Sequence, residues 1–243
     1  MPPDSATASP SNLVAVPSAN TRTMADVQRF IAGERTRLST IPFLRALEGT
    51  GTAEQIQRTV PRLAFFVLCF QDVLRLANER TTEPQLKHFS EEHQAEDLGH
   101  DLWYLHDLAQ LQAERDTAWL FSEEHQLTRD VAYSQIGDVL AATHDCTRMA
   151  VVLSLEAIGA EFFGRAIGFL DRTRGSSDLK YFARKHQQIE SNHKVFENDK
   201  QSELDAIPLS AAGWDEAKRA IENTFAGMTR LGADLHTAFT GST

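Results

Sequence analysis

The sequence predicts an all-α protein with a single folded domain, and three observations support this prediction. Helix-starting and helix-ending residues recur along the chain from Thr23 onward. Long alternating runs of β-branched residues, which are typical of strands, are absent. A chain of 243 residues with 42% hydrophobic side chains can bury one sizeable core. We therefore expect a bundle of about seven or eight helices around that core.

Capping residues, prolines and glycines delimit the expected helices. The stretch from Thr23 to Asp26 resembles a capping box and starts the first helix. Pro42 suits the first turn of the second helix. Pro61 is expected to kink the third helix. The helices are expected at about 24–38, 42–49, 53–80, 85–112, 129–144, 147–173, 178–201 and 211–237.

Composition excludes several classes of protein. The net charge of −10 argues against a nucleic-acid or anionic-membrane partner, because both require a basic surface. The longest apolar run, residues 63–70, is too short to span a bilayer. Residues 1–20 hold four of the eight prolines and are expected to form a disordered tail. They lack the pattern of a signal peptide, so we expect a cytoplasmic protein.

The segment from residue 186 to 193 is rich in potential metal ligands. In a helix, His186, Glu190 and His193 would share one face. Imidazole and carboxylate together suit iron, manganese or zinc. The alternative is a solvated polar face, since the neighbouring residues are hydrophilic.

A second segment repeats this pattern. In a continuous helix, His93, Glu96 and His100 share a face, with Asp97 on its flank. A solvated acidic face would also explain this segment. Two such helices in one chain, however, favour a metal site over a coincidence of polar residues.

Glu156 supplies a third feature, because it interrupts an apolar helix that should lie inside the bundle. A carboxylate buried there costs several kcal/mol unless a cation or hydrogen-bond donors compensate it. A metal ion would compensate it, and so would Arg148 or Arg165. Bridging carboxylates with histidines at the ends are how helical proteins hold two irons.

The order of these residues resembles that in the heme-oxygenase-like diiron oxidases and oxygenases, which share the fold of heme oxygenase, TenA and PqqC. In that family the ligands are a Glu and a His on the third core helix, a Glu on a later helix, and a final His-x3-Asp-x2-His helix. Here His100, Glu156 and the segment 186–193 follow in that order. Residues 41–49 also resemble a segment common in TenA-like chains. The resemblance covers roughly residues 24–239.

The chain departs from the family pattern at two positions. Glu190 stands where the family usually has Asp. The first Glu is ambiguous, because its two usual registers fall on His93 and Asp97. We favour Glu96, with His93 as a ligand or a neighbouring group. The expected metal ligands are then His93, Glu96, His100, Glu156, His186, Glu190 and His193.

The resemblance implies a heme-oxygenase-like diiron domain over residues 21–243. It implies two Fe ions that cycle between Fe(II) and Fe(III), with O2 as co-substrate. The implied activity is that of a biosynthetic oxidoreductase acting on a small organic acid, amino acid or amine, by N-oxygenation, C–C cleavage or desaturation. The expected partner is this small-molecule substrate, and an external electron donor and a homodimer are left open. The choice of iron over manganese rests on the resemblance alone.

Three other functions remain open at this point. A ferritin-like iron protein would need a further carboxylate on an earlier helix, and Asp72 is the best candidate. A metal-free enzyme related to TenA or PqqC would use Cys146 as nucleophile. A non-enzymatic helical binding module would leave the histidines unexplained. Several aromatic residues are candidates to line a pocket, although core packing would explain most of them: Phe65, Phe66, Phe70, Tyr104 and Phe162.

Overall fold

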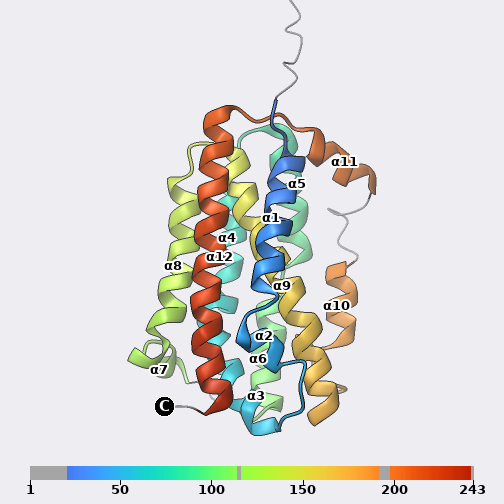
Figure 1. The fold of residues 1–243 in the computed structure, drawn as a ribbon, viewed down its shortest axis with the longest axis vertical. Coiled ribbons are helices and arrows are strands. Elements are labelled where there is room, and N and C mark those ends of the chain that lie inside the picture. Colours follow the sequence, from blue (N-terminus) through green and yellow to red (C-terminus); the bar gives the residue numbers. More distant parts are fainter. Residues whose placement is uncertain (1–20, 114–115, 192–197, 242–243) are drawn as a thin grey trace, which may run out of the picture.

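The computed structural model describes residues 21–113, 116–191 and 198–241, and within them it confirms an all-α architecture (Figure 1). In that part of the chain no β-strand forms, and one isolated bridge joins Thr23 and Pro208. The helices are α1 (Met24–Leu38), α2 (Pro42–Ala46), α3 (Ala53–Thr59), α4 (Ala64–Arg80), α5 (Pro84–Glu96), α6 (His100–Gln110), α7 (Thr117–Leu120), α8 (Gln126–Ala141), α9 (Asp145–Thr173), α10 (Arg184–Ser191), α11 (Asn198–Ala206) and α12 (Ala211–Thr240).

Helix α9 is the central helix of the bundle. It packs against α12 and α1, and also contacts α4, α5, α8 and α10 (Figure 1). Every residue from Thr147 to Leu155 is buried, so this part of α9 is surrounded on all sides. Glu156 follows this buried stretch directly. The fold therefore delivers one carboxylate into the interior of the bundle.

The expected start of the first helix and the expected irregularity at Pro61 are confirmed. The Thr23 backbone N–H donates to Asp26 Oδ2 at 3.0 Å, which completes the capping box of α1. Pro61 lies in a short 3-10 helix, Val60–Leu63, that separates α3 from α4. A proline cannot supply the amide that a continuous α-helix would need there.

The prediction of one helix over residues 85–112 is wrong, because the chain breaks between α5 and α6. Asp97 ends α5, and Gly99 adopts a left-handed conformation with φ of 93°. This conformation strains residues that carry a Cβ, whereas glycine adopts it freely. His93, Glu96 and His100 therefore do not lie on one continuous helical face.

The helix expected over 178–201 is also interrupted. It starts only at Arg184. The buried carboxylate of Asp107 on α6 accepts hydrogen bonds from the backbone N–H groups of Lys180 and Phe182, both at 2.8 Å. These contacts hold the preceding segment out of the helix and fix the point at which α10 begins.

Helices α9 and α12 are joined at one end by Glu216. Its carboxylate accepts hydrogen bonds from the Thr143 N–H at 2.8 Å, the His144 N–H at 3.1 Å and His144 Nδ1 at 2.6 Å. Burial by itself raises the pKa of Glu216. The bonds from Thr143 and His144 outweigh burial and lower this pKa to about 2. The carboxylate thus caps the start of α9 from a neighbouring helix.

Replacing Glu216 with glutamine should destabilise the protein by about 1–2 kcal/mol at neutral pH, as for the loss of a helix cap. Because the folded pKa is lowered, this stabilisation is present above the unfolded value of about 4.3 and is lost as the pH falls towards 2. Urea unfolding between pH 7 and pH 2 should therefore show a smaller acid-dependent loss in the variant. Glu222→Gln, an exposed position on the same helix, should behave like the parent protein.

Among the described residues, no helix combines the length and the apolar character that a bilayer-spanning helix requires.

Candidate metal centre

Three side chains from two helices converge inside the bundle. His93 Nε2 lies 2.9 Å from Glu156 Oε1 and 3.0 Å from Asp97 Oδ2. Potential ligand atoms of His93, Asp97 and Glu156 all lie within 4.8 Å of one another. His93 and Asp97 are buried, with exposed side-chain fractions of 1% and 3%. This group, here called the His93 cluster, has the donor types of a transition-metal site.

The local structure explains why these three residues meet. His93 and Asp97 are four residues apart at the end of α5, so their side chains lie on the same face. The Gln71 side chain of α4 donates a hydrogen bond at 2.7 Å to the Asp97 backbone carbonyl and fixes this helix end. Glu156 of helix α9 faces this end of α5, with its Oε1 against His93 Nε2.

The charges of the His93 cluster are strongly coupled. Burial opposes a charged imidazolium at His93, but the adjacent carboxylates of Glu156 and Asp97 outweigh it and hold the pKa of His93 well above its ordinary value. Burial likewise opposes ionisation of Asp97. Contacts with His100 and His93 outweigh that penalty and lower the pKa of Asp97. The two flanking carboxylates thus favour the charged form of His93.

The raised pKa of His93 predicts a specific pH dependence of stability. A group with a raised folded pKa stabilises the fold fully below its unfolded pKa of about 6.5, and this contribution disappears as the pH rises through the folded value. The free energy of unfolding of the metal-free protein should thus decrease above about pH 6.5. Urea unfolding from pH 6 to pH 10 tests this, and His93→Gln should lack that component of the decrease.

His100 and His186 extend the cluster towards a cavity. His100 Nδ1 donates to Asp97 Oδ1 at 2.8 Å, and His186 Nδ1 donates to the Tyr181 carbonyl at 2.6 Å. In each ring the proton on Nδ1 makes Nε2 the basic nitrogen that would bind a metal. The two imidazole centroids are 4.4 Å apart. The structure thus brings together the predicted residues His93, His100, Glu156 and His186.

The other three predicted ligands are not seen in this group. One lies elsewhere, and two have side chains outside the described residues. Glu96 is not among the converging atoms of the described residues, and Asp97 occupies the place expected for it. The physical reason is that His93 and Asp97, four residues apart, share the buried face of this helix, whereas Glu96 is only partly buried. Glu190 falls in the last turn of α10, but its side chain lies outside the described residues, and so does the whole of His193.

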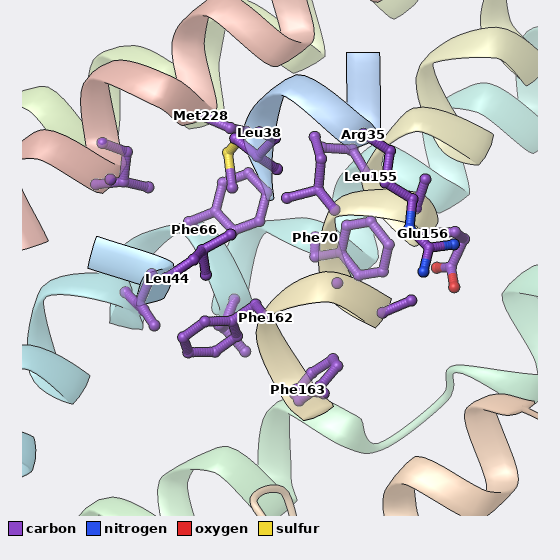
Figure 2. Close-up of a pocket in the computed structure, with 18 of the residues that line it drawn as sticks. Arg35, Leu38, Leu44, Phe66, Phe70, Leu155, Glu156, Phe162, Phe163 and Met228 are labelled. Carbon is purple, nitrogen blue, oxygen red and sulfur yellow. The ribbon is translucent and has the colours of Figure 1, made fainter. Parts of the chain in front are cut away.

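The cluster opens into a cavity of about 500 Å³. Asp97, His100, Glu156 and His186 line one part of it, and apolar side chains of α1, α2, α4, α9 and α12 form most of the remaining wall (Figure 2). This volume is within the range of about 300–1,000 Å³ that small-molecule pockets occupy.

The aromatic residues proposed from the sequence divide between cavity and core. Phe66, Phe70 and Phe162 line the cavity. Phe65 packs instead against Phe121 and Tyr133 on the far side of α4. Tyr104 is fully buried, donates its hydroxyl to the Val60 carbonyl and packs on Tyr181.

The arginines that could have neutralised Glu156 pair elsewhere. Arg148 binds Asp145 at 2.6 Å, and Arg165 binds Glu48 and Glu161. His93 instead lies against the Glu156 carboxylate, with Nε2 at 2.9 Å from Oε1.

The residues on which two alternative functions depend lie away from the cavity. Cys146 is ten residues before Glu156 on α9, which is about 15 Å along a helix, and it does not line the cavity. Burial raises the pKa of its thiol, which disfavours the reactive thiolate. Asp72, the further ligand that a ferritin-like site would need, is 56% exposed and pairs with Arg75.

Two residues that matter for the site were not singled out from the sequence. Asp107 sets the start of α10 and hence the position of His186. Arg35 of α1 lines the cavity. Nothing in the local sequence around either residue indicates these contacts, because both depend on segments distant along the chain.

Comparisons with known proteins bear on the fold. The sequence matches no protein-family model and no curated protein. Its structure is similar to a crystal structure of a domain of unknown function with a heme oxygenase-like fold from Shewanella denitrificans OS217. The TM-score is 0.60 at 16% sequence identity, and the match covers 87% of this chain and 91% of that chain.

Proposed function

We propose that this chain, which has a heme oxygenase-like fold, is a non-heme diiron, O2-dependent oxidase or oxygenase. The observation that carries the proposal is the convergence of His93, Asp97 and Glu156 at one end of a largely apolar cavity. The proposed substrate is a small organic acid, amino acid or amine, oxidised by N-oxygenation, C–C cleavage or desaturation.

The residues of the His93 cluster fit a metal ion by their chemistry. Imidazole and carboxylate are donors that iron accepts. The carboxylates of Asp97 and Glu156 flank His93 and raise its pKa, so this position favours positive charge. A bound metal cation would take over that role, and His93 would release its proton on binding.

The proposed second metal would lie towards α10. His186 is the described residue on that side, and its Nε2 is the basic nitrogen. Glu190 and His193 complete this proposal from the sequence pattern. When bound, a pair of irons would supply the reduction of dioxygen.

The protein's own residues would hold and shield this chemistry. Asp97 Oδ1 orients the His100 imidazole through a hydrogen bond, and Asp97 Oδ2 lies 3.0 Å from His93 Nε2. Trp103 and Phe163 pack against His186, with ring centroids at 5.4 and 4.9 Å. These contacts fix the ring and keep water from its faces. The apolar wall of the cavity would limit side reactions with solvent.

Iron loading tests the proposal. The protein, purified without a histidine tag, would be loaded with Fe(II) under anaerobic conditions, the iron counted, and O2 then added while the visible spectrum is recorded. We expect about two irons per chain, a transient absorption band on addition of O2, and loss of iron in His186→Ala. His106→Ala, with a half-exposed histidine on α6, is the matched control. Absence of stoichiometric iron would contradict the proposal.

A further inference from the structure

The cavity has two chemically distinct ends. Figure 2 shows Glu156 and Arg35 at one end, and Leu38, Leu44, Phe66 and Met228 at the other. A second charged group on a ligand would be desolvated without a partner at the apolar end, at a cost of several kcal/mol. The cavity therefore suits a molecule with one polar head and an apolar chain.

Arg35 is the cationic residue placed to select the head group. Its Nε donates to Glu161 Oε1 at 2.7 Å, and Glu161 is itself held by Arg165. Within the described parts of the chain, the two terminal nitrogens of Arg35 have no hydrogen-bond partner. The Arg35 side chain is 46% exposed, so it stands at the rim of the cavity, where an entering ligand can reach it. Glu161 thus fixes the guanidinium and leaves its fork of donors available.

We infer that the cavity binds a monocarboxylate with an apolar chain, whose carboxylate pairs with the terminal nitrogens of Arg35. A guanidinium fork matches a carboxylate with two parallel hydrogen bonds. An amine head would instead meet a like charge at Arg35. Two carboxylates of the cavity, Asp97 and Glu156, lie against His93, and Glu161 is held by Arg35 and Arg165. This inference rests on the proposed function only for the claim that the bound acid is oxidised.

Direct binding to the metal-free protein tests the head group. Octanoate, octylamine and suberate would be titrated by calorimetry into the parent protein and into Arg35→Gln, Arg35→Lys and Arg37→Gln. Arg37 lies on the same helix but pairs with Glu34 and does not line the cavity, so it is the matched control. We expect octanoate to bind, and Arg35→Gln to weaken it about 10- to 100-fold, as for loss of a charge-assisted hydrogen bond. Arg35→Lys should recover part of this loss, and Arg37→Gln should match the parent.

The apolar end of the cavity can be tested separately, with carboxylates of different alkyl chain length. Affinity should rise about fourfold for each added methylene until the apolar end is full, which corresponds to ~0.8 kcal/mol per buried CH2. Met228→Phe should lower the chain length at which this rise stops and leave the binding of hexanoate unchanged. A merely structural role of Arg35 in linking α1 to α9 would not alter ligand affinity in this way.

The titrations can distinguish failure of this inference from failure of the proposed function. The titrations would be repeated with Fe(II) under anaerobic conditions, where no turnover occurs. Binding of octanoate that depends on Arg35, in a protein that takes up no iron, would support the inference and contradict the proposed function. Iron uptake without carboxylate binding in either state would overturn the inference. Binding of octylamine or suberate as tight as octanoate, or an unchanged affinity in Arg35→Gln, would also overturn it.

Discussion

Replacing His93 with alanine is expected to lower the affinity for Fe(II) by at least about 100-fold, since loss of even an outer partner of a metal ligand costs about 10- to 100-fold. The same change should destabilise the metal-free protein by about 3 kcal/mol. It removes the imidazole that lies between the Asp97 and Glu156 carboxylates and so breaks a buried ion pair, although Asp97 keeps its hydrogen bond with His100. Both effects share one cause, which is that the position of His93 is built around a cation.

Iron titration and urea unfolding of the same variant measure the two effects. His88→Ala is the matched control, because His88 lies on the same helix with an exposed side chain that approaches Glu92. This control should leave iron affinity unchanged and shift stability by less than about 0.5 kcal/mol. A His93→Ala protein that binds iron like the parent would show that the cluster is only a buried ion pair.

Replacing Asp107 with alanine is expected to destabilise the protein by about 3 kcal/mol. The change removes the acceptor of the part-buried Lys180 N–H and of the buried Phe182 N–H, and a buried donor without a partner costs about 1–3 kcal/mol. The start of α10 should then loosen, and His186 with it. Iron affinity should therefore fall even though Asp107 lies outside the proposed ligand set.

Urea unfolding and amide hydrogen exchange of residues 180–188 measure the effect of Asp107→Ala. His106→Ala serves as the control, since the His106 ring contacts Asp107 at 3.0 Å but does not hold the backbone of α10. Unchanged protection of the Lys180 and Phe182 amides in Asp107→Ala would contradict the assigned role.

The sequence was sufficient to predict the helical bundle because the signals for it are local. Caps such as Thr23 with Asp26, and breakers such as Pro61, act within a few residues of themselves. The apolar stretch before Glu156 likewise predicts burial without any knowledge of tertiary contacts. These features survive in the structure because no distant contact opposes them.

The details of the site depend on long-range contacts and were less accessible. The break at Gly99 lies inside a segment whose histidine spacing also fits an uninterrupted helix, so periodicity favoured Glu96 over Asp97. Asp107 acts on residues 73 and 75 positions away, and Arg35 reaches Glu161 across 126 positions. Helical periodicity carries no information at such separations.

Anomalous diffraction at the iron edge, from crystals grown anaerobically with Fe(II), would test the central claim most directly. We expect an iron peak within bonding distance of His93 Nε2 and of carboxylate oxygens of Asp97 and Glu156. We expect a second peak bound by His186. Iron located elsewhere on the molecule, with the His93–Glu156 contact of 2.9 Å intact, would contradict the account.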